Sequence, residues 1–224
     1  MLARDFNLMV LQIRDKIEMQ KFVSSSTMEM IAGGHEARLG GTRKPITAMF
    51  TDIRGFTSFS EKHSPEEVIE ILNLYLDLQT QIIQNHKGVV DKFLGDGIMS
   101  IFSGDHQTEN AIEAAIHIQR ELAKMNHRRK SWKDNVLEVG IGISAGDAVL
   151  GSIGSQDRMD FTAIGDTVNL ASRICGIAAS GQIMVTEEII KVLDGKYSSR
   201  SEGKIPIKGK QNQVPVYQIP LQSS

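Results

Sequence analysis

Two apolar, strand-like runs between residues 46 and 102 each lead to an aspartate, and this arrangement constrains the fold most strongly. The first run ends at Asp52, and the second is interrupted by the turn Gly95-Asp96-Gly97. β-Branched and aromatic residues on both sides of an Asp-Gly turn are typical of a tight β-hairpin. Pairing of the first run with this hairpin, in either direction, would bring the two carboxylates to one sheet edge. Paired carboxylates suit hard divalent cations and leave room for phosphate ligands.

Either aspartate alone has a simpler explanation, because Asp tolerates turn conformations and hydrogen-bonds its own backbone. The surrounding residues shift the balance toward a metal site. Three motifs follow one another along the chain: F-T-D-I-R-G-F-T around Asp52, K-F-L-G-D-G around Asp96, and T-A-I-G-D-T-V-N-L-A-S-R over residues 162–173. In this order and spacing they resemble the class III nucleotidyl cyclases, the catalytic domains of adenylyl and guanylyl cyclases. The resemblance covers about residues 44 to 220.

The resemblance implies an adenylate cyclase, a phosphorus-oxygen lyase that converts ATP into 3′,5′-cyclic AMP and pyrophosphate. The ribose 3′-hydroxyl attacks the α-phosphate of the same nucleotide, and such in-line transfers depend on positioning and on charge neutralisation. Two divalent cations, Mg²⁺ or Mn²⁺, would activate the hydroxyl and hold the triphosphate. By resemblance, Asp52 and Asp96 hold these cations, and the backbone carbonyl of Ile53 completes the ligand set.

Two polar residues, Asn169 and Arg173, are four positions apart in a predicted helix and therefore share one face. Such a pair is usually an exposed polar pair on a helix surface. By resemblance, they orient the ribose and stabilise the pentavalent phosphate, a role that suits the planar, permanently charged guanidinium. Lys208 matches the family's triphosphate-binding lysine. Lys210 is the alternative, and a solvated loop lysine is the simpler interpretation of either residue.

The choice of base can be argued from hydrogen-bond donors and acceptors. Adenine offers an acceptor at N1 and a donor at N6, whereas guanine reverses both. Lys92 is an obligate donor and the hydroxyl of Thr162 can accept, so this pair fits adenine. Guanylyl cyclases of the resembled family carry an acidic residue and a cysteine at these two positions. ATP is therefore the predicted substrate, and a mispaired polar edge should penalise GTP.

The sequence departs from the family pattern at Gly140, where many members carry an arginine that reaches the phosphates. Its absence either lowers activity or transfers the role to Arg54 or to the lysines. The metal-binding residues of this family come from one subunit and the base-, ribose- and phosphate-binding residues from the other. Because this chain holds both sets, the resemblance implies a homodimer with two equivalent sites.

The order of predicted elements indicates an α+β fold with helices packed on a mainly antiparallel sheet. Ser64-Pro65-Glu66-Glu67 is a capping box that begins one long helix, and Thr108 is expected to cap a second. Residues 136–153 contain four glycines and are predicted to form two neighbouring strands joined near residues 146–147. By resemblance, the sheet and helices form the class III cyclase core, which is ferredoxin-like.

Three segments are predicted: an N-terminal helix over residues 1–32, a linker over 33–44 and the catalytic domain over 45–220. Phe6, Val10, Ile13 and Ile17 form one apolar stripe, which indicates either a parallel coiled coil with another helix or a helix folded back on the domain. In the resembled family such a segment often links an upstream sensor to the catalytic domain. The resemblance therefore implies a signalling helix and, if the chain is a fragment, a sensor partner.

Composition is that of an ordinary globular protein, with 41% hydrophobic and 23% charged residues and a formal net charge of −2 over 224 residues. There is no basic stripe, so we expect no binding to nucleic acid. No secretory signal or membrane-spanning run is present, and the lone cysteine, Cys175, is expected to be buried in a reducing compartment. These features predict a cytoplasmic protein or the cytosolic part of a membrane-tethered one.

Two rival functions remain at this point. Another two-metal phosphoryl-transfer enzyme, such as a diguanylate cyclase, lacks support because its G-G-[DE]-E-F type of signature is missing. A catalytically weak or silent nucleotide-binding regulatory dimer is the alternative from a different class. The intact residues Asp52, Asp96, Asn169 and Arg173 argue against it.

Overall fold

The computed structural model describes residues 10, 13–14, 17–18, 40–155, 159–207 and 212–221. Most of the predicted N-terminal helix, Lys208 and Lys210 lie outside these residues. In chain order the elements are β1 (Gly40–Arg54), α3 (Phe56–Ser60), α4 (Pro65–Asn85), β2 (Val89–Leu94), β3 (Gly97–Phe102), α5 (Gln107–Ser131), β4 (Glu138–Gly154), β5 (Met159–Ile164), α6 (Asp166–Ile177), β6 (Ile183–Thr186), α7 (Glu187–Leu193), β7 (Arg200–Ile205) and β8 (Val214–Gln218).

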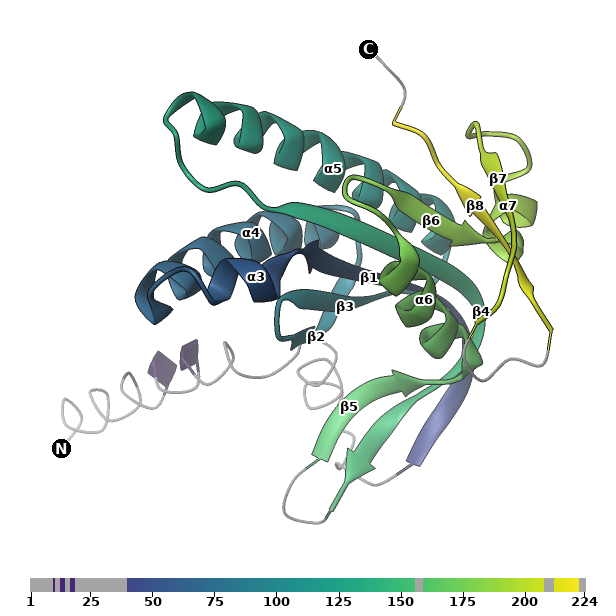
Figure 1. The fold of residues 1–224 in the computed structure, drawn as a ribbon. Coiled ribbons are helices and arrows are strands. Elements are labelled where there is room, and N and C mark those ends of the chain that lie inside the picture. The colour runs from purple at the N-terminus through teal and green to yellow at the C-terminus, as the bar shows by residue number, and fades with distance from the viewer. Residues whose placement is uncertain are drawn as a thin grey trace, which may run out of the picture.

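Within the described ranges, eight strands form one sheet in the order β2-β3-β1-β4-β6-β8-β7, and β5 pairs with β4 (Figure 1). All neighbouring strands are antiparallel except β4 and β6, which run parallel. The prediction of an α+β fold with a mainly antiparallel sheet is therefore confirmed. None of the described helices is both long and apolar enough to span a membrane.

Helices cover both faces of the sheet (Figure 1), and β1 shows how one strand serves both layers. Successive side chains of a strand point to opposite faces. Met49 accordingly joins the core formed with α4, α5 and α7. Ala48 and Phe50 pack on the other face, against residues of α6. Asp52 lies two residues beyond Phe50, so this alternation places it on the face that α6 covers.

Local signals at the helix starts give mixed results. The capping box is confirmed: Oγ of Ser64 accepts from the backbone N–H of Glu67, whose side chain accepts from the N–H of Ser64. The prediction that Thr108 caps the second long helix is wrong, because α5 begins at Gln107. Thr108 is buried instead, and its hydroxyl is 3.0 Å from that of Thr47 in β1.

The segment predicted as two strands near residues 146–147 is one continuous strand, β4, of 17 residues. It pairs with β1 along the whole length of β1, from Gly40–Ser152 to Arg54–Glu138. Its second half, the start of β1 and β5 together project from the body as an arm (Figure 1). Three apolar side chains of this arm are exposed: Val149 at 39%, Ile153 at 41% and Ile164 at 53%.

Candidate active site

The β2–β3 hairpin places Asp96 beside the end of β1. Asp52 lies opposite Gly97 in the antiparallel β1–β3 pair, and Asp96 directly precedes Gly97. Gly95 has a φ of 67°, a left-handed conformation that favours glycine. A Cβ at Gly97 would lie only 2.5 Å from the carbonyl oxygen of Thr51, so the close approach of the strands requires glycine there. The hairpin predicted around Asp96 is therefore confirmed.

The two carboxylates influence one another electrostatically. Burial raises the pKa of Asp96, and the nearby charge of Asp52 raises it further. Arg54 opposes this effect and donates a hydrogen bond of 2.6 Å from Nη1 to Oδ2 of Asp52. Like charges held close together in a partly buried site are stabilised by a divalent cation.

The donor set fits a hard cation such as Mg²⁺ or Mn²⁺. In the described part of the chain, no three or more His, Cys, Asp or Glu side chains gather in a way that could hold a metal. The protein would thus supply two carboxylates, leaving other positions to backbone and substrate oxygens. The side chain of Ile53 is only 3% exposed and packs in the core with α4 and α5, so this residue could contribute only its carbonyl.

Lys92 and Thr162 are brought together by a residue that sequence reasoning missed, Asp91. The Thr162 hydroxyl donates a hydrogen bond of 2.7 Å to Oδ2 of Asp91, and Nζ of Lys92 lies 3.4 Å from the same oxygen. The Asp91 side chain has no exposed surface, and burial raises its pKa while Thr162 and Lys92 lower it. The only signal in the sequence was its position directly before Lys92.

The polar face of α6 carries Asn169, which is exposed, and Arg173, which is half-buried. The opposite side of this helix is anchored by Ala171 and Ile174, which are fully buried. Among the described residues, neither Asn169 nor Arg173 has a side-chain hydrogen bond or ion pair. No hydrogen bond or ion pair within the described part of one chain joins these two residues to Asp52 or Asp96, although α6 packs against β1.

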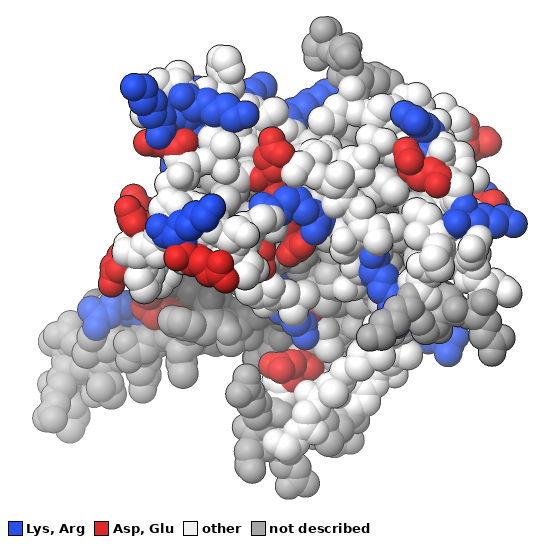
Figure 2. Space-filling model, viewed as in Figure 1, with Lys and Arg blue, Asp and Glu red and all other residues white. Residues whose placement is uncertain are grey.

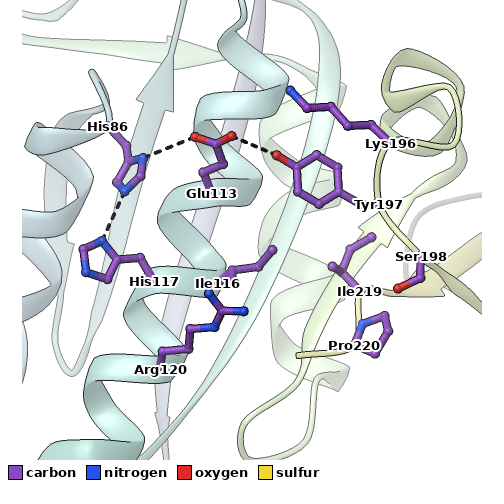
Figure 3. A pocket seen from close by; sticks show the side chains of 10 residues that line it. All are labelled: His86, Glu113, Ile116, His117, Arg120, Lys196, Tyr197, Ser198, Ile219 and Pro220. Carbon is purple, nitrogen blue, oxygen red and sulfur yellow. Dashed lines mark hydrogen bonds and ion pairs between the residues drawn. The ribbon is translucent and has the colours of Figure 1, made fainter. Parts of the chain in front are cut away.

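A cavity of about 440 Å³ lies elsewhere (Figure 3), between α5, the end of α4 and the segment after α7. Most of its polar groups are already paired. Nε2 of His86 is 3.2 Å from Nδ1 of His117, and the Tyr197 hydroxyl donates to Glu113 at 2.9 Å. Burial and the neighbouring His117 lower the pKa of His86. This cavity is on the α4 and α5 side of the sheet, away from α6.

Comparison with known proteins agrees with this geometry. The family model for the adenylate and guanylate cyclase catalytic domain matches residues 41–220. An adenylate cyclase of Anabaena cylindrica is 35% identical over 212 residues, covering 89% of this chain and 42% of the relative. The chain thus spans less than half the length of this relative.

Two solved structures are similar in fold and sequence. The adenylyl cyclase CyaB from P. aeruginosa has a TM-score of 0.78 and 31% identity, covering 83% of this chain and 98% of that one. The guanylyl cyclase Cya2 has a TM-score of 0.73 and 32% identity, covering 81% and 94%. The chain belongs to the class III adenylate and guanylate cyclase catalytic domains. Because both activities occur among its neighbours, the fold alone does not choose the base.

Proposed function

We propose that this chain is an adenylyl cyclase that converts ATP into 3′,5′-cyclic AMP and pyrophosphate. The observation that carries the proposal is the contact of Thr162 and Lys92 with Asp91. A threonine hydroxyl has one hydrogen, and Thr162 donates it to Asp91, so toward a ligand this hydroxyl can only accept. Lys92 can only donate. One acceptor and one donor complement N6 and N1 of adenine and oppose the matching edge of guanine.

The reaction requires neutralisation of the negative charge of the triphosphate. The 3′-oxygen forms a bond to the α-phosphorus, the bond from this phosphorus to the bridging oxygen breaks, and the hydroxyl loses its proton. Asp52, Asp96 and the Ile53 carbonyl would hold two cations, which when bound acidify the hydroxyl and carry the charge of the leaving pyrophosphate. Asn169 would orient the ribose, Arg173 would bind the equatorial phosphate oxygens, and Lys208 would bind the triphosphate.

Two copies of the chain would share each site. The family resemblance assigns Asp52 and Asp96 to one subunit, and Asn169 and Arg173 to the other. Within the described residues of one chain no hydrogen bond or ion pair joins the two sets, which supports the assignment. The exposed apolar side chains of the arm also suit burial against a second copy, because exposed apolar patches commonly mark such interfaces.

A product assay tests the substrate. Purified protein is incubated with ATP or GTP and with Mg²⁺ or Mn²⁺, and cyclic products are separated and quantified. We expect cyclic AMP, with GTP disfavoured by about tenfold or more, because each mispaired buried polar group costs about 1–3 kcal/mol. Asp52→Ala is the inactive control. Equal turnover of GTP would contradict the base assignment, and nucleotide binding without either product would indicate the silent regulatory dimer instead.

One face of the molecule suits a small anionic substrate rather than a long polyanion. The face seen in Figure 2 carries acidic and basic side chains interspersed, without a continuous basic stripe. We therefore propose a nucleotide as the ligand and a second copy of the chain as the partner. We also propose a cytoplasmic location, free or as the cytosolic part of a membrane-tethered protein.

A further inference from the structure

Arg54 connects the candidate metal site to α6. Its Nη1 donates to Oδ2 of Asp52 at 2.6 Å, and its Nη2 donates to the carbonyl oxygen of Cys175 in the last turn of α6. Carbonyl groups at a helix C-terminus carry partial negative charge, so a guanidinium is stabilised there. The Arg54 side chain is 20% exposed, and its Nε is buried without a hydrogen-bond partner among the described residues. Arg54 therefore bridges a carboxylate and a helix end inside the domain.

Gly140 makes this path possible. It lies opposite Asp52 in the β1–β4 pair. A Cβ at this position would come within 2.5 Å of Nε and 2.8 Å of Cζ of Arg54. Any side chain at residue 140 would thus occupy the space that the guanidinium fills. The two residues form one unit: glycine at 140 admits Arg54, and Arg54 then reaches both Asp52 and Cys175.

A cation and Arg54 would compete for the same carboxylate. A divalent ion held by Asp52 would repel the guanidinium and would compete with it for the carboxylate. The contact with Cys175 then stands alone, and α6 loses part of the link that ties it to β1. Because α6 also carries Asn169 and Arg173, the state of the metal site is transmitted to the residues proposed to bind the ribose and phosphates.

We propose that Arg54 is a positioning residue that holds Asp52 against α6 until a cation displaces it, and that Gly140 is required for this contact. The inference rests on the proposed function, in which Asp52 is a metal ligand. Since Asn169 and Arg173 of the same chain serve the other site of the dimer, the Arg54 contact couples the two sites. The contact also explains why glycine stands at 140, where many family members carry arginine: an arginine at 140 would exclude Arg54 from this position.

Gly140→Ala is the decisive variant, because it displaces Arg54 without removing its charge. The atoms in the way belong to a flexible side chain, so the chain is expected to fold. Gly176→Ala is the matched control. Gly176 lies in α6, next to Cys175, and a Cβ there would meet nothing within 4 Å. Arg54→Ala is the second variant, which removes the guanidinium itself.

Mn²⁺ binding is measured without nucleotide from the electron paramagnetic resonance signal of free Mn²⁺, and Asp96→Ala identifies the specific site by abolishing it. We expect Gly140→Ala and Arg54→Ala to bind Mn²⁺ about threefold more tightly, the size of a partly exposed ion pair. Turnover should nonetheless fall. A variant that merely damaged the fold would instead lose both Mn²⁺ binding and turnover. Gly176→Ala should bind Mn²⁺ as wild type does.

Amide hydrogen exchange of α6 supplies the second readout. In wild type, exchange in the last turn of α6 should rise when Mn²⁺ is added; in Gly140→Ala it should already be fast and should not respond. Unchanged Mn²⁺ affinity together with wild-type exchange in Gly140→Ala would overturn the inference. Failure of the proposed function would give a different result: Mn²⁺ would still change amide exchange in α6, but no cyclic product would form.

Discussion

In the proposed function, Asp91 is the residue on which selection of the base depends most. It is a carboxylate without exposed surface that contacts the two residues proposed to read adenine. Its Oδ1 is buried without a hydrogen-bond partner among the described residues, so its stabilisation rests on Thr162 and Lys92 at Oδ2. A buried charge is tolerated only when it is paired, which fixes the orientation of both partners.

Asp91→Asn should therefore weaken the discrimination between ATP and GTP. The amide can donate to Thr162, which frees the threonine hydroxyl to donate toward a base, and Lys92 loses its ion pair. We expect the ratio of kcat/KM for ATP to that for GTP to fall about tenfold, as for loss of one charged hydrogen bond. Asp105→Asn, at an exposed position, is the control. An unchanged ratio would show that Asp91 does not orient the base-reading pair.

Asp96 would give the proposed metal site a pH dependence. A carboxylate must lose its proton before it can bind a cation, and burial together with Asp52 raises the pKa of Asp96. Protons therefore compete with metal at a higher pH than at an ordinary aspartate, whose pKa is about 3.9. Mn²⁺ affinity should fall on acidification, by up to about tenfold per pH unit. A midpoint no higher than that of an exposed aspartate would contradict this account.

At the scale of elements, the β2–β3 hairpin sets the position of Asp96. Gly97→Ala should shift this hairpin away from β1, because the new Cβ would meet the backbone oxygen of Thr51 rather than a movable side chain. We expect a loss of about 1–3 kcal/mol in the free energy of unfolding, typical of overpacking, together with weaker Mn²⁺ binding. Gly176→Ala again serves as control. Wild-type stability and wild-type metal affinity would show that the close approach is unnecessary.

Signals contained in a few neighbouring residues predicted their elements correctly. The capping box at Ser64 and the turn at Asp96 each depend on contacts within four residues, so the sequence was sufficient. The glycines of β4 led to the wrong prediction of two strands, because clustered glycines are also typical of a turn between strands. Gly142 instead allows the backbone of α6 near Cys175 to approach, and a Cβ at Gly151 would meet the backbone of Gly40. Glycine is required both where distant segments approach closely and where the chain turns, so its presence alone does not distinguish the two.

Contacts between distant residues could not be predicted. Thr108 resembles a helix cap, yet its hydroxyl meets Thr47, which is 61 residues away. Asp91 meets Thr162 across 71 residues, and Arg54 reaches Cys175 across 121. Such pairs depend on where α5, β5 and α6 lie relative to β1 and β2, and no local pattern encodes them. The motifs identified the metal-binding and base-reading candidates, but not the residues that hold them in place.

At the scale of the whole molecule, the sheet separates two layers. The face covered by α6 carries Asp52 and Arg54, whereas α4, α5 and α7 cover the other face. The cavity of Figure 3 lies on that other side, between α5, the end of α4 and the segment after α7. Regulation would then change how two copies are oriented relative to each other, rather than the structure within one copy. We propose that residues 1–32 form a signalling helix whose pairing sets the angle between the catalytic domains. Residues 40–44 of the predicted linker, 33–44, belong to β1, so we propose that the part before β1 links the helix to the catalytic domain.

Deletion of residues 1–32 tests this role. Val10, Ile13 and Ile17 are helical and 46–52% exposed, so these apolar side chains are available to a partner helix. We expect the shortened chain to dimerise more weakly and to lose activity at low protein concentration, because each proposed site would need both subunits. Sedimentation and turnover are measured over a concentration series. Identical dimerisation and identical rates would remove the helix from the account.

Mixing two inactive variants tests whether each site is built from residues of two copies. Asp52→Ala and Arg173→Ala should each be nearly inactive alone. In an equimolar mixture about half of the dimers carry one intact site, so activity should recover to about a quarter of wild type. Asp52→Ala mixed with Asp96→Ala should stay inactive, because both defects fall in the same set of residues. No recovery in the first mixture, although mixed dimers form, would contradict the shared site.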